Sequence, residues 1–423
     1  MTDESEILRQ AHVAFGTDDA PAVRRLLDQY PALKARINDP IGPFDSPAIM
    51  NVRSREMLDV LLDAGADINA RSQWWAGGFS LLDCASPEIA AYAIERGARI
   101  TAHAAARLGM PDKLAALIEA EPALVNARGG DGQTPLHFAS TVGIAEYLLE
   151  RGADIDARDI DHESTPAQYM VAKRPEIARY LVGRGCKTDI LMAAALGDLE
   201  LIRRHLDADF ESIRTRVSDE YFPMVSPRNG GTIYQWVLGW HCSAAQVSRS
   251  FGHSECFDLL MERSPDDEKL LNACWLHDEA TVRSLLAKNP DIRAQLTPSG
   301  RRQLAHAARN NDTVAARLMI EANLPVDAYS QHHATPLHWA AWHGNAEVVR
   351  LILQRNPPLD DTSNDYQGTA VDWAVHGSEN GWDRRNSDYE ATVEALLEAG
   401  VALPQRVGGT EAVRATLRRH GMK

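Results

Sequence analysis

A ten-residue string recurs along this chain with little change. LLDAGADINA at residues 61–70 returns as LLERGADIDA at residues 148–157. Gly65 and Gly97, which stand at the same place in two neighbouring copies, are 32 residues apart, and other neighbouring copies are separated by 33 or 34 residues. Units of this length bury their apolar faces only against neighbouring units. The period therefore predicts a stack of similar small units, and not one globular core.

A second recurring string marks where the units begin. TPLHFA stands at residues 134–139 and TPLHWAAWHG at residues 335–344. The threonine can cap a helix, and the proline after it can occupy the first helical position, where its missing N–H costs nothing. A second segment, such as residues 346–353, has apolar residues at helical spacing, and in several copies a glycine then ends the helix. Each unit is therefore predicted to be a pair of helices followed by a turn.

With this period and these strings, the chain resembles the ankyrin-repeat family. The resemblance implies an all-α solenoid of helix-turn-helix pairs with β-turn fingers, and it covers essentially the whole chain as one domain, residues 1–423. About twelve repeats are expected between residues 6 and 403, with a capping helix over residues 410–420. Several copies are degenerate, as in bacterial members of the family. At residues 26–31, for example, a proline replaces the glycine that would end the second helix.

Two segments are too long for a finger or for a turn within a repeat. The first, residues 214–242, contains prolines and an Asn-Gly-Gly turn before the aromatic run at residues 232–238, and this pattern predicts an elongated β-hairpin. The second, residues 377–388, is polar except for Trp382. Insertions in solenoids often emerge on the binding face, so each segment is a candidate lid or wall. The alternative is a variable surface loop.

Tryptophan and histidine are concentrated in the C-terminal half. Seven of the nine Trp and ten of the fifteen His lie beyond residue 230. The resemblance implies that the residue after the signature histidine, and the two residues before the closing glycine, face the concave side. A large residue after the signature histidine can also pack between helices, and for Trp339 and Trp373 this interpretation stays open. The candidate ligand- or partner-binding residues are Trp339, Trp342, His343, Trp373, His376, Trp275, His306, Trp236, Trp240, His241, Tyr234 and Trp382.

Charge and composition make several classes of partner poor candidates. A formal net charge of −15 would repel phosphate backbones and anionic lipid surfaces, so neither nucleic acid nor membrane is an expected partner. The acidic first residues and the lack of a long apolar run predict a cytoplasmic protein. Five cysteines without a C-x-x-C pair argue against a disulfide framework and against a thiolate metal site.

Two signature histidines are not site candidates, and two histidines at a finger tip are not expected to bind a metal ion. His137 and His338 belong to the TPLH signature and should make structural hydrogen bonds to a neighbouring finger. His332 and His333 are adjacent at a finger tip. Adjacent side chains in an extended chain point in opposite directions, so they rarely bind one metal ion.

These features favour a binding scaffold over an enzyme. Ankyrin-type scaffolds mostly hold protein partners, and clustered aromatic residues make good hot spots. The expected function is therefore to hold an unidentified protein partner on the concave or finger face, with the hot spot in the C-terminal half. The alternative is a small-molecule-binding or catalytic pocket, lined by Trp and His, between residues 214–242 and the C-terminal repeats. No motif indicates a particular reaction, and neither a cofactor nor a metal is expected.

Overall fold

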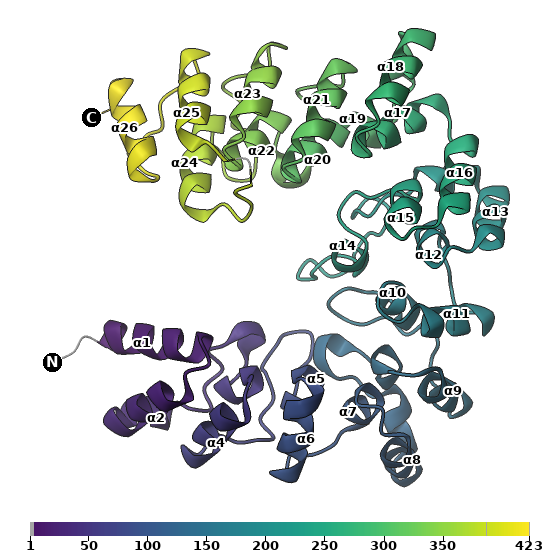
Figure 1. Ribbon diagram of the computed structural model, residues 1–423, viewed down its shortest axis with the longest axis vertical. Helices are drawn as coiled ribbons and strands as arrows, with labels where there is room; N and C mark the ends of the chain where they lie inside the picture. The colour runs from purple at the N-terminus through teal and green to yellow at the C-terminus, as the bar shows by residue number, and fades with distance from the viewer. Residues whose placement is uncertain (1–3, 386, 423) are drawn as a thin grey trace. The chain divides into compact units, whose positions relative to one another are not determined.

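The computed structural model describes residues 4–385 and 387–422, and it consists of helices joined by turns and loops (Figure 1). The chain divides into two compact units. The first contains Met1–Leu196 together with Val217–Gly239, and the second contains Gly197–Arg216 together with Trp240–Lys423. Each unit has its own hydrophobic core. The organisation of residues 1–423 as one uninterrupted solenoid stays a prediction.

The first unit is a series of short helices. Its α-helices are α1 (Glu4–Gly16), α2 (Ala20–Gln29), α3 (Pro31–Ala35), α4 (Arg55–Asp63), α5 (Leu81–Cys84), α6 (Pro87–Glu95), α7 (Ala102–Arg107), α8 (Pro111–Ala120), α9 (Val142–Glu150), α10 (Pro166–Met170), α11 (Pro175–Gly183), α12 (Ile190–Leu196) and α14 (Tyr234–Val237). Its 3-10 helices are η1 (Pro43–Asp45), η2 (Ala48–Asn51), η3 (Pro122–Asn126), η4 (Gly130–Gly132) and η5 (Pro135–Phe138).

The second unit follows the same plan and ends in the expected capping helix, α26. Its α-helices are α13 (Leu199–Ala208), α15 (Ala244–Ser250), α16 (Ser254–Arg263), α17 (Asp266–Trp275), α18 (Glu279–Lys288), α19 (Pro298–Arg301), α20 (Gln303–Arg309), α21 (Thr313–Glu321), α22 (Pro336–Trp342), α23 (Ala346–Leu353), α24 (Ala370–Asn380), α25 (Tyr389–Glu398) and α26 (Glu411–Arg419). Its 3-10 helices are η6 (Phe210–Arg214), η7 (Ile292–Gln295) and η8 (Gln331–His333). Across the described part of the chain, no helix has both the length and the apolar character needed to cross a membrane.

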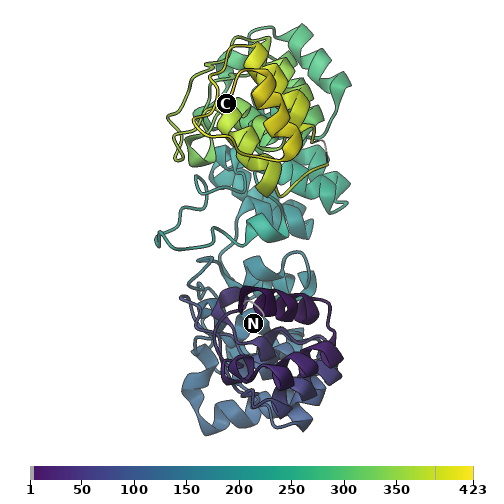
Figure 2. The ribbon, with the colours of Figure 1, turned by 90° about the vertical axis from the view of Figure 1, so that its left-hand side faces the viewer.

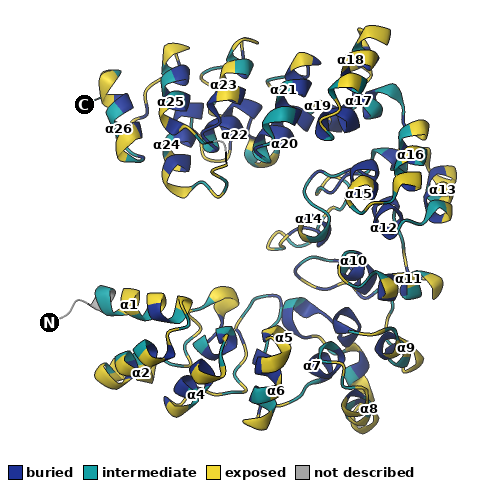
Figure 3. Ribbon diagram, viewed as in Figure 1, coloured by how far each residue is buried: buried dark blue, intermediate teal, exposed yellow. Residues whose placement is uncertain are grey.

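Helix pairs of the second unit pack against the pairs before and after them. The first helices α20, α22 and α24 are successive neighbours, and so are the second helices α21, α23 and α25 (Figures 1 and 2). The first helix of a pair is deeply buried, as α22 shows (Figure 3). In α22 only the C-terminal Trp342 is partly exposed. Trp342 therefore lies in the row of first helices and still reaches solvent.

The predicted start and end signals act as expected. Thr335 caps α22 by accepting a hydrogen bond from the backbone N–H of His338, and Pro336 occupies the first turn. The glycine after α9, Gly152, has φ of +88°, which a residue with a side chain rarely adopts. The recurring strings therefore fix both ends of the helix pairs.

The two signature histidines have the structural role expected of them. His338 Nε2 lies 3.0 Å from the carbonyl oxygen of Asp361. His137 Nε2 lies 3.2 Å from the carbonyl oxygen of Ser164. Each of these histidines therefore ties its helix to the finger of the following repeat.

The prediction of a β-hairpin over residues 214–242 is wrong. Residues 4–385 and 387–422 contain isolated bridges but no strand. The backbone N–H groups of Val225 and Ser226 donate to the Glu163 carboxylate at 2.9 and 2.8 Å, and the N–H of Gly230 donates to the carbonyl oxygen of Asp161 at 2.9 Å. Because these donors bond to a neighbouring finger, the segment forms a loop against that finger.

The second long segment, residues 377–388, is shorter as a loop than the sequence suggested. Helix α24 continues to Asn380 before the chain turns. The loop then leads to Asp388, which caps α25. Position 386 lies outside the described residues.

Candidate functional site

A pocket of about 340 Å³ opens on the second unit beside α22 and α24. Aromatic side chains make most of its wall, and two histidines and a carboxylate complete it. Five of the twelve predicted site residues meet there. The residues that line the pocket are His332, Trp339, Trp342, Tyr366, Gly368, Asp372, Trp373, His376 and Trp382.

The four tryptophans of this pocket form one connected cluster. The rings of Trp339 and Trp373 are nearly perpendicular, at 83°, with centroids 5.1 Å apart. Trp382, from the loop after α24, lies 5.0 Å from Trp342 and 6.1 Å from Trp339. Each such contact stabilises an aromatic pair by about 0.5–1.5 kcal/mol beyond the area buried. These contacts hold the wall of the pocket in a defined shape.

Trp339 and Trp373 both pack between helices and line the pocket. They are only 2% and 5% exposed. The indole N–H of Trp339 donates to Ser330 Oγ at 2.9 Å, and that of Trp373 donates to Asn364 Oδ1 at 3.3 Å. The two interpretations left open by the sequence are therefore compatible.

The other tryptophans of the cluster are more accessible. Trp382 is 61% exposed, Trp342 is half-buried and His376 is exposed. The indole N–H of Trp342 is covered and, within the described residues, has no hydrogen-bond partner. The exposed rings of Trp382 and His376 therefore lie on the open side of the pocket.

The pocket also contains polar groups that could orient a ligand. Asp372 Oδ2 accepts hydrogen bonds from the N–H and the hydroxyl of Thr369, at 2.8 and 2.9 Å. His332 Nδ1 lies 3.2 Å from Asp365 Oδ2. The neighbouring His333 stacks on Tyr329 instead, with centroids 4.1 Å apart. The two adjacent histidines thus have different partners.

His343 does not line the pocket. Its side chain is fully buried, with Nε2 2.8 Å from the carbonyl oxygen of Arg309 and Nδ1 3.3 Å from that of Asp383. Burial lowers its pKa. The ring joins α20 to the loop that carries Trp382, so His343 positions the pocket wall from behind.

Trp240 extends the aromatic surface of the second unit, and His241 is buried beside it, with ring centroids 5.5 Å apart. The guanidinium of Arg309 lies 5.2 Å from the ring of Trp240 and 5.5 Å from the ring of Trp339. His241 stacks on His306 with centroids 3.5 Å apart, and both are buried. Burial lowers the pKa of both rings, that of His306 to about 3. Arg309 therefore connects the pocket cluster to Trp240.

The remaining predicted site residues lie outside this surface. Trp275 is buried, and its indole N–H donates to Gln303 Oε1 at 3.0 Å. Tyr234 belongs to the first unit, is fully buried and donates its hydroxyl to Asp189 at 2.9 Å. Trp236, also in the first unit, is 72% exposed.

Sequence reasoning did not identify Tyr366 and Arg309 as site residues. The ring of Tyr366 lies 5.6 Å from that of Trp373. Tyr366 stands three residues before Thr369, as His332 stands three residues before Thr335. Aligning the fingers on the capping threonines Thr335 and Thr369 would therefore have identified Tyr366 and His332 as residues at the same position of the repeat. Arg309 ends an ordinary helix, and its sequence context contains no such signal.

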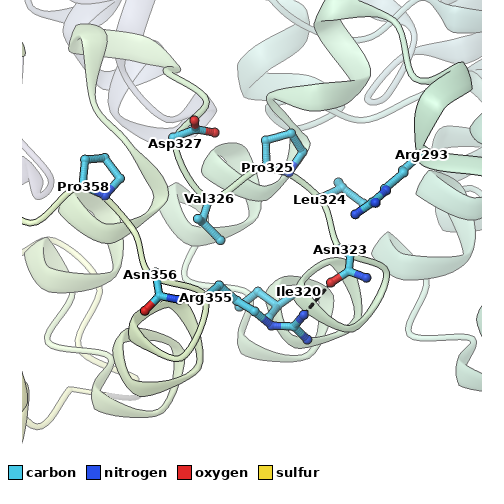
Figure 4. A pocket seen from close by; sticks show the side chains of 10 residues that line it. All are labelled: Arg293, Ile320, Asn323, Leu324, Pro325, Val326, Asp327, Arg355, Asn356 and Pro358. Carbon is cyan, nitrogen blue, oxygen red and sulfur yellow. Dashed lines mark hydrogen bonds between the residues drawn. The ribbon is translucent and has the colours of Figure 1, made fainter. Parts of the chain in front are cut away.

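Two other hollows are present and differ in chemistry. The larger, about 630 Å³, lies in the first unit around α1, α2 and α3 and is mostly apolar. The other, about 350 Å³, lies in the second unit at the ends of α21 and α23. Figure 4 shows its ten lining residues, among which Arg355 donates a hydrogen bond to Asn323. None of these ten is aromatic. The Trp-lined pocket is therefore the one of these three hollows whose wall is mainly aromatic.

The sequence matches a family model described as "Ankyrin repeats (3 copies)". The match covers residues 102–191 and residues 270–365. The first range lies within the first unit and the second range within the second unit.

Several curated plant proteins are similar to parts of this chain. An E3 ubiquitin-protein ligase from Arabidopsis thaliana, KEG, is 25% identical over 362 residues, which are 75% of this chain and 21% of the ligase. The E3 ubiquitin-protein ligase XB3 of Oryza sativa subsp. japonica is 31% identical over 93 residues, which are 22% of this chain and 21% of that protein. The chain thus spans about a fifth of the length of these relatives.

Proposed function

Because this chain carries ankyrin repeats, we propose that it is a binding scaffold that holds a protein partner on the Trp-lined pocket of its second unit. The partner inserts one side chain, or a short segment, between Trp342, Trp373 and Trp382. Surrounding contacts extend along the aromatic surface toward Arg309 and Trp240. Neither the curated relatives nor the repeats name that partner.

The convergence of four tryptophans on one pocket carries this proposal. Hot spots of protein interfaces are enriched in Trp, Tyr and Arg and lie in pockets that a partner can desolvate completely. Trp339 and Trp373 are fixed by the core, whereas Trp382 exposes 61% of its surface. Because Trp339 and Trp373 are already held in place and Trp382 is exposed, a partner can bury a large apolar area on these rings without ordering many side chains.

A small organic molecule is the second candidate occupant. The pocket volume of about 340 Å³ lies near the lower end of the range of ligand sites. Asp372 and the His332–Asp365 pair supply polar groups at its edge. A flat ring or a cation would be stabilised by the aromatic wall. This occupant would use the same residues as a protein partner.

Selection of peptides from a displayed random library, with the full chain as target, tests the scaffold proposal. Peptides that bind the proposed site should lose affinity for a Trp382→Ala variant. Truncation of a central hot spot typically costs about 2 kcal/mol or more, which is roughly thirtyfold in Kd. Isothermal titration calorimetry on the selected peptides measures this change.

Trp236→Ala is the matched control, because Trp236 is a similarly exposed tryptophan in the first unit. It should leave the affinity of the selected peptides unchanged. Peptides that bind Trp382→Ala as tightly as the unmodified chain, but not Trp236→Ala, would place the recognition site on the first unit. If no peptide is selected but small ring-containing molecules bind the pocket, the small-molecule alternative is favoured.

A further inference from the structure

Three side chains with metal-binding atoms meet in the finger loops of the first unit, away from the Trp-lined pocket. Asp131 comes from the finger that contains η4, and Asp161 and His162 come from the finger of the following repeat. One potential ligand atom from each residue lies within 4.8 Å of the other two. This cluster is absent from the candidate residues predicted from the sequence, whose histidines all lie in the C-terminal half of the chain.

Backbone hydrogen bonds hold the two fingers and the long loop together at this point. The carbonyl oxygen of Asp131 accepts the N–H of Ile160 at 2.7 Å and that of Asp161 at 3.2 Å. Gly230, in the loop of residues 225–231, donates to the carbonyl oxygen of Asp161. A Cβ at Gly230 would come within 3.0 Å of the His162 ring. Three segments distant in sequence are therefore closely packed around the cluster.

The hydrogen bond of His162 determines which ring nitrogen is available. Nδ1 lies 2.7 Å from the carbonyl oxygen of Gly231. A carbonyl oxygen only accepts hydrogen bonds, so Nδ1 carries the proton and Nε2 of the neutral ring has a free lone pair. Nε2 faces Asp161 Oδ2 at 3.7 Å, too far for a hydrogen bond. A backbone carbonyl that accepts the distal N–H is the usual arrangement behind a metal-bound imidazole.

Asp161 is buried and Asp131 half-buried, and neither carboxylate has a cation beside it among the arginines and lysines of the described residues; the indole N–H of Trp74 lies near Asp131 and partly opposes the rise in its pKa. The Asp161 side chain is only 7% exposed, and no described residue donates a hydrogen bond to it. Oδ1 of Asp131 is covered and has no partner within the described part of the chain. Burial and the nearby charge of Asp161 raise the pKa of Asp131 to about 6. Buried charges of this kind are costly unless a cation or a donor compensates them.

A neighbouring carboxylate shows what a structural role looks like in the same finger. Asp159 Oδ1 accepts the N–H of Ser164 at 2.7 Å. Its Oδ2 accepts the N–H of His162 at 2.8 Å and the hydroxyl of Tyr169 at 3.0 Å. Asp159 therefore closes the finger turn, whereas Asp131 and Asp161 each place a carboxylate oxygen within 4.8 Å of a ring nitrogen of His162.

We propose that Asp131, Asp161 and His162 bind a divalent transition-metal ion through one carboxylate oxygen from each aspartate and Nε2 of the histidine. The imidazole ligand favours ions such as Mn²⁺, Fe²⁺ or Zn²⁺ over Mg²⁺ and Ca²⁺, which prefer oxygen ligands alone. Bonds of about 2.1 Å hold tetrahedral ligand atoms roughly 3.4 Å apart. Ligand atoms that now lie up to 4.8 Å apart therefore move closer together when the ion binds. An open coordination position remains for water or for a carboxylate of the protein partner.

Binding of Mn²⁺ to the full chain tests this site, because Mn²⁺ has little affinity for the free thiols of this protein. The electron paramagnetic resonance signal of free Mn²⁺ should decrease with a stoichiometry of one ion per chain. Asp161→Asn and His162→Gln should each weaken binding by at least about tenfold, since loss of even an outer partner of a ligand costs that much. Asp112→Asn, which removes an exposed carboxylate of α8, should bind as the unmodified chain does.

Two results would overturn the proposal. One is the absence of any bound Mn²⁺ at millimolar concentration in the unmodified chain, which would leave an imidazolium–carboxylate contact as the role of the cluster. The other is binding that is equally tight in Asp161→Asn. If that variant fails to fold, paramagnetic broadening of the His162 ring protons in the unmodified chain decides the question: the site requires selective broadening of this histidine by Mn²⁺.

Discussion

Both units bury carboxylates, but among the described residues only the buried carboxylates of the second unit form salt bridges with arginine. In the second unit, Arg216 Nη2 lies 2.7 Å from Glu268 Oε2, and Arg214 Nη1 lies 2.6 Å from Asp267 Oδ2. In the first unit, Asp131 and Asp161 have no arginine or lysine partner among the described residues. The carboxylates of the second-unit cluster are neutralised by arginines, whereas no arginine or lysine of the described residues neutralises Asp131 and Asp161 in the first unit.

This difference arises outside the repeat framework. The framework is the same in both units: Thr134 with His137, and Thr335 with His338, form the same capping box. Finger tips and inner helix positions are free to differ, and they contain acids in one unit and aromatic rings in the other. The repeated backbone thus determines the positions of the side chains, while the residue types at those positions differ from repeat to repeat.

Removal of one charge from each cluster should affect stability in opposite directions. Arg216→Ala leaves the buried Glu268 with one cation fewer, and breaking a buried pair typically costs about 3–5 kcal/mol. Arg214 stays 3.4 Å from the other oxygen of Glu268, which places the expected cost near the lower end. Asp161→Asn removes an unpaired charge and should leave the metal-free protein as stable or up to about 1 kcal/mol more stable. Urea denaturation measures both free energies of unfolding.

A double variant, Arg216→Met with Glu268→Gln, controls for lost packing. It should be less destabilised than Arg216→Ala, because no charge is left without its partner. Equal destabilisation by Arg216→Ala and Asp161→Asn would contradict the comparison, since it would mean that the first cluster is also electrostatically satisfied.

Acidification should destabilise the second unit more than the first. Burial lowers the pKa of His241, His306, His338 and His343 in the described part of the second unit, and of His103 and His137 in that of the first. A histidine with a lowered pKa binds its proton mainly in the unfolded state, so stability falls as the pH drops below about 6.5. For His306, with a pKa of about 3, the loss by pH 5 is about 2 kcal/mol.

Asp131 should act in the opposite direction within the first unit. Its pKa is raised to about 6, so the folded state takes up a proton before the unfolded state does as the pH falls.

Tryptophan fluorescence reports mainly on the second unit, which contains six of the nine tryptophans. Urea midpoints at pH 7 and pH 5 should therefore shift more by fluorescence than by circular dichroism. His306→Gln should reduce the fluorescence shift, and equal shifts by both probes would argue against this distribution of buried histidines.

The helix pairs could be predicted from the sequence because their signals are local. Thr335 followed by Pro336 marks a cap and a first turn wherever it occurs, and Gly152 marks a helix end. The pocket could be predicted only in part. Trp339, Trp342 and Trp373 were found because the repeat assigns them to one face of successive helices.

The contacts that bring distant loops together could not be predicted in this way. The hairpin expected over residues 214–242 fails because Glu163 and Asp161 accept its backbone donors, and nothing in the segment itself encodes those partners. His343 was placed on the surface by its position, yet the loop at Asp383 covers it. Asp131 and His162 lie in different repeats, so their meeting depends on the packing of two fingers.

The smallest expected effect separates the recognition surface from the stability of the two units. Trp236 is 72% exposed, so its replacement by Ala should change the free energy of unfolding by about 0.5 kcal/mol or less. Trp382 is 61% exposed, and its replacement should cost about 0.5–1.5 kcal/mol because ring contacts are lost. Trp382 has more to lose, because it contacts Trp342 at 5.0 Å, whereas no aromatic contact involves Trp236 among the described residues. Thermal denaturation of both variants measures the difference.

A loss of more than about 2 kcal/mol for Trp382→Ala would show that this ring is a structural part of the second unit. In that case, weaker peptide binding by the variant would reflect a damaged pocket, and Trp382→Phe, which keeps an aromatic ring there, would be needed to separate recognition from folding.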